Sequence, residues 1–196
     1  MEAIRKYLAE IEQAIREISR DDVTAVVDVL EACWVSGNTT FVVGNGGSAS
    51  TASHMMNDLN KFTIVPGARR FRAIALTDNL PMMKSWGNDA TYDDVFVEPL
   101  RNLMNDGDVL IAISGSGNSP NVLRAIEYAN GRGTTIGLCG FPGGKLAVLA
   151  KHRVIVPAMS IGQQEDGHLI INHAVATALR ARIEAQLLAA PAQAFA

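Results

Sequence analysis

Apolar residues recur along the first 36 positions with the three- and four-residue spacing of amphipathic helices. They fall into two groups on either side of Asp21 and Asp22, acidic residues typical of a helix start. The apolar positions are Ile4, Leu8, Ile11, Ile15, Ile18, Val23, Val26, Val27, Leu30 and Cys33. Residues 1–36 are therefore expected to form a helical hairpin. Its apolar stripe could face the rest of the chain or another subunit, and the second arrangement would make the protein an oligomer.

From residue 39 onward the apolar residues come in short continuous runs. These runs occupy 39–43, 72–76, 108–114, 134–139 and 153–157. Continuous apolar runs indicate strands covered on both faces, as in a parallel sheet. Helical stretches lie between and after them, near 48–60, 80–88, 92–104, 119–130, 143–150 and 165–188. The pattern predicts a three-layer, doubly wound α/β fold with a five-stranded parallel sheet. We expect a single domain over residues 1–196, with its α/β core and last helix in 39–188.

Composition narrows the possible classes of function. The 196 residues carry a formal net charge of −3, with a pI of about 5.8, which disfavours a general electrostatic role on nucleic acid. No run approaches the ~20 apolar residues of a membrane span, and the N-terminal stretch lacks the apolar region of a signal peptide. Cys33 and Cys139 are too far apart to indicate a disulfide framework or a cysteine metal site. We therefore expect a cytoplasmic protein without nucleic-acid or membrane partners.

The loops after the apolar runs are the candidate binding sites, because ligands of such sheets bind beyond the carboxyl ends of the strands. GNGGS at 44–48 lacks the G-x-G-x-x-G spacing of a dinucleotide loop, and GGK at 143–145 lacks the full nucleotide phosphate-loop pattern. SGSGNSP at 114–120 combines hydroxyls with bare backbone N–H groups at a helix start, where an anion is stabilised. A phosphate group is favoured there over simple helix capping by Ser119.

Further polar candidates lie on two of the expected helices. His54 and Asp58 are four residues apart, so they share one helical face and could hold a metal or a substrate together. Glu165 and His173 are separated by about 12 Å of helix rise, so both reach one ion only if Glu165 lies in the loop before the helix. His168 and His173 point about 140° apart on a helix, so at most one of them faces a given site.

These motifs together resemble the sugar-isomerase (SIS) domain family, and within it the phosphoheptose isomerases. The matching segments are GNGGSA with the H-x-x-x-acid helix after it, GND at 87–89, DVLIAISGSGNSPNVLRA, TIGLCGFPGGKLA and E-D-G-H-x-x-x-x-H. The resemblance spans nearly the whole chain. It implies a flavodoxin-like SIS fold and a homotetramer with its sites between subunits. The implied activity is an aldose–ketose isomerase that converts sedoheptulose 7-phosphate to D-glycero-D-manno-heptose 7-phosphate through an enediol(ate), for nucleotide-activated heptose synthesis.

The resemblance also assigns roles to individual residues. Asp58 matches the family's catalytic base, and His173 matches its histidine acid/base. One zinc ion per site would be held by His54, Asp58, Glu165 and His173. The serines of the 114–119 loop would hold the phosphate, and Asn45 and Ser48 the sugar chain. The implied substrate-binding residues are Asn45, Gly46, Gly47, Ser48, Asn88, Asp89, Ser114, Gly115, Ser116, Asn118, Ser119 and Glu165.

The chain departs from the family pattern at several of these positions. Asp58 replaces a glutamate, Glu165 a glutamine and Gly115 a threonine, while Lys61 is the cation nearest to where the family has an arginine. A misplacement of about 1 Å can cost on the order of 100-fold in rate, so these changes bear on the substrate. Two alternatives stay open beside the heptose isomerase. The chain could isomerise another sugar phosphate, or it could be a non-catalytic phosphosugar-binding or adaptor protein of the replication-initiator-binding type.

Overall fold

Five parallel strands form the central sheet. They are β1 (Thr40–Gly44), β2 (Ala73–Ala75), β3 (Val109–Ser114), β4 (Thr134–Gly140) and β5 (His152–Val156), in the order β2-β1-β3-β4-β5. Every residue of β1 and β3 is buried, whereas the edge strand β5 is only partly buried. The predicted five-stranded parallel sheet is confirmed in the computed structural model, which describes residues 1–189.

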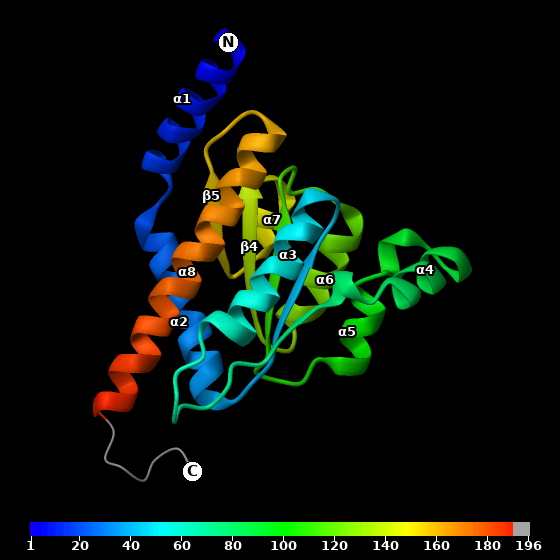
Figure 1. Cartoon of the computed structure of the whole chain (residues 1–196). Coiled ribbons are helices and arrows are strands. Elements are labelled where there is room, and N and C mark those ends of the chain that lie inside the picture. Colours follow the sequence, from blue (N-terminus) through cyan, green and yellow to red (C-terminus); the bar gives the residue numbers. More distant parts are fainter. Residues whose placement is uncertain (190–196) are drawn as a thin grey trace.

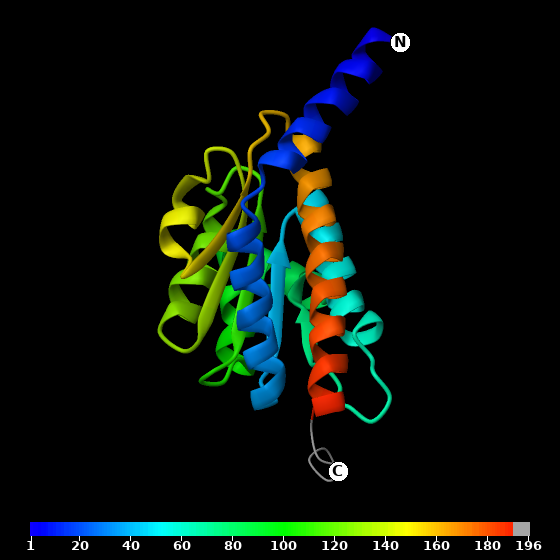
Figure 2. The ribbon, with the colours of Figure 1, turned by 90° about the vertical axis from the view of Figure 1, so that its left-hand side faces the viewer.

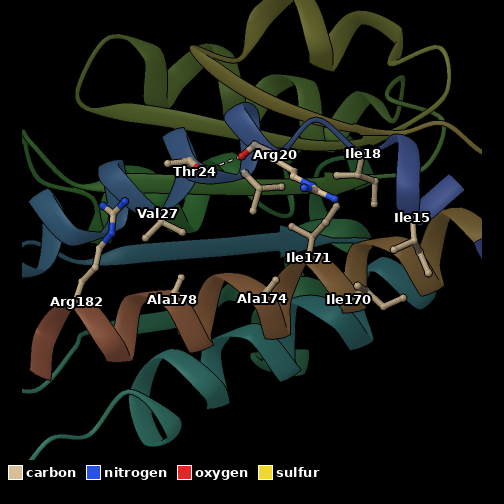
Figure 3. A pocket seen from close by; sticks show the side chains of 11 residues that line it. Ile15, Ile18, Arg20, Thr24, Val27, Ile170, Ile171, Ala174, Ala178 and Arg182 are labelled. Atoms are coloured by element: carbon tan, nitrogen blue, oxygen red, sulfur yellow. Dashed lines mark hydrogen bonds between the residues drawn. The ribbon is translucent and has the colours of Figure 1, made fainter.

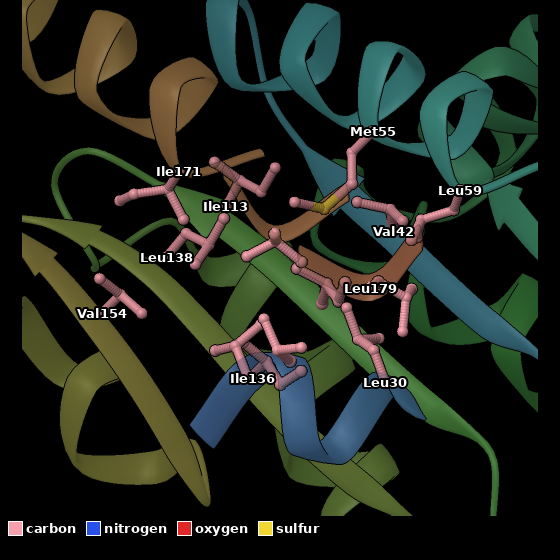
Figure 4. Close-up of a cluster of buried hydrophobic side chains, with 14 of the residues drawn as sticks. Leu30, Val42, Met55, Leu59, Ile113, Ile136, Leu138, Val154, Ile171 and Leu179 are labelled. Atoms are coloured by element: carbon pink, nitrogen blue, oxygen red, sulfur yellow. The ribbon is translucent and has the colours of Figure 1, made fainter. Parts of the chain in front are cut away.

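Helices cover both faces of this sheet (Figures 1 and 2). On one face lie α2 (Arg20–Ser36), α3 (Gly47–Asn57) and α8 (Ile161–Ala189), and on the other lie α5 (Val97–Leu103), α6 (Pro120–Asn130) and α7 (Gly144–Leu149). Alternate strand residues supply the two cores: Val42 belongs to the first cluster and Phe41 to the second. Figure 4 shows the first cluster, where Leu30 of α2, Met55 of α3 and Leu179 of α8 converge on the strands. The three layers predicted from the sequence are confirmed.

The two expected N-terminal helices are α1 (Glu2–Glu17) and α2, joined at Ile18 and Ser19. Ser19 caps α2, because its hydroxyl accepts a hydrogen bond from the backbone N–H of Asp22 at 3.2 Å. Helices α1 and α2 follow one another along the molecule, and α1 extends beyond the sheet (Figures 1 and 2). Its apolar stripe divides accordingly: Ile11 packs in the core, whereas Leu8 is 60% exposed.

Three helical segments differ in detail from the expected ranges. α3 ends at Asn57 and continues as η1, a π-helical turn over Asp58–Phe62. The stretch expected as one helix at 92–104 is a 3₁₀ turn, η3 (Tyr92–Asp94), followed by α5, whose first turn accommodates Pro99. α8 begins at Ile161, where a backbone bond from Gln164 to Ser160 forms its first turn, so Glu165 is inside the helix.

The remaining elements connect β2 to β3. The short η2 (Leu76–Asp78) leads into α4 (Leu80–Asp89), whose first turn is capped by the Asn79 side chain, which accepts from the backbone N–H of Met82 at 3.2 Å. No residue of α4 is buried, and the helix stands away from the sheet (Figure 1). None of the helices within residues 1–189 has the length and apolar character that crossing a membrane requires.

Candidate active site

The loops after β1 and β3 lie side by side, at the point where the connections of the sheet change from one face to the other. These strands are neighbours, yet β1 leads into α3 on one face and β3 into α6 on the other. Such a switch point opens a crevice at the carboxyl ends of the strands. A cavity of about 140 Å³ lies there, the serine pocket, lined by Asn45, Ser48, Ile113, Ser114, Gly115, Ser116, Ser119, Ile161 and Glu165.

Three hydroxyls converge in the serine pocket. The Ser114 Oγ lies 3.4 Å from the Oγ of Ser116 and 3.4 Å from that of Ser119. Ser119 occupies the N-cap position of α6 but makes no side-chain capping bond, so its hydroxyl is not used to close the helix. Gly117 has a φ of 62°, which turns the loop, and its N–H donates to Ser114 Oγ at 3.1 Å. Converging hydroxyls at a helix N-terminus suit a phosphate group.

Asn45 is held by Asn121, a residue that the sequence did not single out. The Asn45 Nδ2 donates to Asn121 Oδ1 and the Asn121 Nδ2 donates to Asn45 Oδ1, both at 2.9 Å. The backbone N–H of Val122 also donates to Asn121 Oδ1, which determines the orientation of both amides. Tyr92 Oη donates to Asn45 Oδ1 at 3.2 Å. Asn45 Oδ1 therefore has both lone pairs engaged, and Asn45 retains one N–H for a ligand.

Glu165 belongs to the serine pocket. Its carboxylate lies against Gly47 at the start of α3, where any Cβ would overlap it. A glycine at position 47 thus makes room for the carboxylate. The neighbouring Gln164 is buried and lies against Gly115 and Gly140, so the absence of side chains at these two glycines leaves room for Gln164 beside the serine pocket.

A second group of polar residues, the histidine–aspartate cluster, consists of His54, Asp58 and His173. The His54 Nε2 and His173 Nε2 are 3.3 Å apart, and they lie 3.5 and 3.8 Å from Asp58 Oδ2. The π-helical turn that begins at Asp58 follows directly on α3, and such turns occur frequently at functional sites. Both imidazoles are partly exposed, whereas the Asp58 side chain is only 12% exposed. An adjoining cavity of about 350 Å³ is lined by Asp58, Phe62, His173, Ala176 and Thr177.

This cluster fits a zinc ion. Two imidazole nitrogens and a carboxylate oxygen are donors that zinc prefers, and all three ligand atoms lie within 4.8 Å of one another. Bonds of about 2.1 Å in tetrahedral geometry place ligand atoms roughly 3.4 Å apart, close to the separations found here. Glu165 does not join the cluster within one chain. It lies inside α8 rather than in the entry loop, so about 12 Å of helix rise separates it from His173.

The remaining predicted residues are placed as follows. Asn88 and Asp89 lie at the end of α4, where Asn88 Nδ2 donates to Asp89 Oδ1 at 2.7 Å, and neither lines the serine pocket. Asn118 is engaged within its loop, donating to the Ser116 carbonyl and accepting from the Lys145 backbone N–H. Gly46 precedes α3 with a φ of 55°.

His168 faces the interior, whereas His173 faces the cluster. The His168 ring is fully buried, and neither ring nitrogen makes a hydrogen bond of good geometry with residues 1–189, although a contact with the Cys139 backbone partly opposes the effect of burial on the pKa. Loss of hydration on burial lowers the pKa of His168 to about 4, so the ring is neutral at pH 7. The expectation that at most one of the two histidines faces a given site is consistent with this arrangement.

Known proteins match the chain over most of its length. A family model described as the SIS domain matches residues 5–140. A phosphoheptose isomerase of Aquifex aeolicus is 33% identical over 178 residues, covering 88% of this chain and 92% of the relative. The lincomycin biosynthesis protein LmbN of Streptomyces lincolnensis is also 33% identical, covering 89% of this chain and 68% of the relative. The phosphoheptose isomerase GmhA of Neisseria gonorrhoeae superposes with a TM-score of 0.85 at 29% identity, covering 92% of this chain and 98% of that structure.

Proposed function

The chain belongs to the SIS domain family, and we propose that it is a phosphosugar isomerase converting sedoheptulose 7-phosphate to its aldose, D-glycero-D-manno-heptose 7-phosphate. One observation carries this proposal. The loop between β3 and α6 supplies most of a polar pocket suited to phosphate, and α8 together with the π-helical turn after α3 supplies a carboxylate–imidazole pair suited to proton transfer. The relatives called phosphoheptose isomerases support the same substrate class.

The proposed reaction moves one proton between adjacent carbons of the open-chain sugar. It needs a base at carbon, an acid at oxygen and stabilisation of the enediol(ate). We assign the carbon proton to the Asp58 carboxylate and the transfer between the two oxygens to His173. Asp58 Oδ2 and His173 Nε2 are 3.8 Å apart, a separation that lets both groups face the same two-carbon unit. The three serines and the single remaining N–H of Asn45 would hold the phosphate and the sugar chain.

One zinc ion per site is part of the proposal. His54, Asp58 and His173 would hold it, and when bound it would supply Lewis-acid stabilisation of negative charge on the substrate oxygens. A carboxylate that binds zinc is less basic, so His173 then has a larger share of the proton transfer. His54 keeps the cluster compact in either case, because its Nε2 contacts both other members.

We also propose that the site is completed by further copies of the chain in a homotetramer. An apolar groove of about 370 Å³ runs between α2 and α8, flanked by Ile15, Val27 and Ile171 (Figure 3). The exposed stripe of α1 offers a second apolar surface. Asn88 and Asp89 do not line the serine pocket of their own chain, and Glu165 does not join its histidine–aspartate cluster, so these predicted roles need a neighbouring subunit. Light scattering of the purified protein should give four times the chain mass of 20.9 kDa.

The two cysteines are free and buried, and we propose a cytoplasmic location.

The decisive experiment is incubation of the purified protein with sedoheptulose 7-phosphate, with NMR detection of the aldose and of solvent deuterium entering the carbon next to the carbonyl. Asp58→Asn and His173→Ala should each abolish both signals. Asn130→Ala, on α6 away from both groups of polar residues, serves as the matched control and should retain them. Tight binding of the sugar phosphate without turnover would instead favour a non-catalytic phosphosugar-binding or adaptor protein. Turnover of other sugar phosphates only would reassign the substrate.

A further inference from the structure

A buried amide supports the candidate base. Asn172 is 1% exposed and precedes His173 on α8, and its Nδ2 donates to Asp58 Oδ2 at 2.9 Å. This is a hydrogen bond of ordinary length between an amide and a carboxylate, in a place with little competing water. The side chains of two successive helix residues diverge by about 100°. Asn172 therefore points into the protein toward Asp58, while His173 is half exposed beside His54.

The bond determines which carboxylate oxygen faces the histidines. Asp58 Oδ2, the atom that accepts from Asn172, is also the oxygen within 3.5 Å of His54 Nε2 and 3.8 Å of His173 Nε2. Among the residues that the structure describes, the other oxygen, Oδ1, receives only a long bond of 3.4 Å from Asn57 Nδ2. A carboxylate free to rotate would exchange the two oxygens. With Asn172 on one lone pair of Oδ2, the second lone pair of that oxygen remains for a proton or a cation.

We propose that Asn172 is a positioning residue for Asp58, and that the two form a pair matched in length. The catalytic effect of this pair rests on the proposed function, whereas the contact between Asn172 and Asp58 does not depend on that function. A glutamate at position 58 would carry its carboxylate about 1.5 Å further from the backbone, whereas the aspartate already places Oδ2 at 2.9 Å, hydrogen-bonding distance, from the Asn172 amide. The shorter aspartate leaves room for that amide, which then holds the carboxylate toward the two imidazoles.

The test compares Asn172→Leu, which keeps the branched shape and the number of heavy atoms but removes the donor, with the wild type and with Asn130→Leu. Asn130 is a partly buried asparagine that bonds Leu149 and Thr135 remote from the cluster. Loss of a partner that orients a metal ligand typically costs about 10- to 100-fold in metal affinity or activity. Asn172→Leu should therefore lower kcat by about 10-fold or more with KM within 2-fold, and should weaken zinc binding to the metal-free protein, measured by calorimetry, by a similar factor. Asn130→Leu should leave both values unchanged.

A compensating pair tests the match in length. Asp58→Glu alone should reduce kcat and zinc affinity, because the longer side chain meets the Asn172 amide, and Asp58→Glu with Asn172→Ala should recover at least part of the loss. Equal losses in the single and double variants would overturn the matched-pair inference. Values of kcat and zinc affinity within 2-fold of wild type in Asn172→Leu would overturn the positioning role.

One readout needs neither substrate nor metal. The side-chain amide signals of Asn172, assigned by their absence in Asn172→Leu, should move in Asp58→Ala, because the proton on Nδ2 loses its carboxylate partner. Unmoved signals would overturn the contact. If the wild type does not isomerise the sugar phosphate but the signals move and zinc affinity falls in Asn172→Leu, the proposed function fails while the inference about Asn172 stands.

Discussion

Replacing Asn121 by alanine should destabilise the protein and release Asn45 from its position in the serine pocket. Asn121 is 1% exposed and links the loop after β1 to the start of α6 through two amide hydrogen bonds of 2.9 Å. It also accepts from the Val122 backbone N–H at 2.9 Å. The alanine variant loses all three bonds and leaves a buried donor without its partner.

The magnitude follows from these contacts. Each of the two bonds to Asn45 contributes about 0.5–1.5 kcal/mol net, and an unsatisfied buried group costs about 1–3 kcal/mol. The free energy of unfolding should therefore fall by about 2–6 kcal/mol in Asn121→Ala. Asn45→Ala should cost less, because Asn45 is only partly buried and the bond between Val122 and Asn121 survives.

The assay is urea unfolding of the wild type, both single variants and the double variant at one protein concentration, since association would shift the apparent stability. The bonds between Asn45 and Asn121 can be lost only once. The double variant should therefore be less destabilised than the sum of the singles, by about 1–3 kcal/mol. KM for the sugar phosphate should rise in Asn121→Ala but should not rise further when that change is added to Asn45→Ala. Strictly additive stabilities, or an unchanged KM in Asn121→Ala, would refute the reasoning.

Three further predictions concern other parts of the structure. Gly117→Ala should destabilise the protein by about 2–4 kcal/mol and weaken phosphate binding, because it places a side chain at positive φ where its Cβ overlaps the Gly143 carbonyl oxygen. Thermal unfolding with and without inorganic phosphate checks this. A loss of stability below about 0.5 kcal/mol would contradict it. His54→Ala should reduce zinc affinity by more than the roughly 10- to 100-fold typical of losing an outer supporting partner, whereas an equal calorimetric affinity would exclude His54 as a ligand. Because the pKa of His168 is lowered to about 4 in the folded protein, its stabilising contribution is fully present above pH 6.5 and is lost as the pH falls toward 4, by about 3 kcal/mol. His168→Leu should remove that part of the pH dependence in urea unfolding, and an identical pH profile in both proteins would contradict the assignment.

The fold was predictable from the sequence to a large extent because it depends on periodicity. The continuous apolar runs require strands buried on both faces, and the five strands lie within a residue or two of the predicted ranges. The helix ends were less predictable, since they depend on local bonds rather than on the apolar pattern. The early start of α8 at Ile161 is an example, and the π-helical turn at Asp58 is another. Neither is visible in residue spacing.

The candidate site was predictable as a set of residues but not as an arrangement. Asp58 and His173 are 115 positions apart in the sequence, and only the packing of α8 beside α3 brings them within 3.8 Å. Asn121 and Asn172 were missed because a buried asparagine cannot be told from an exposed one by its position on a helix. Each acts only through one partner from a distant element, Asn45 or Asp58.

The sequence by itself determined the α/β class, the parallel sheet and the loops that carry polar chemistry, because these follow from local patterns of apolar residues, glycines and hydroxyls. Only the tertiary structure decided which polar residues share a site. In the folded chain His54 and His173 lie in one cluster, and Glu165 lies outside it. The reason is that Glu165 and His173 belong to the same helix, which holds them about 12 Å apart even though both could bind one ion. Contacts between elements depend on helix packing against the sheet, which no local stretch of sequence encodes alone.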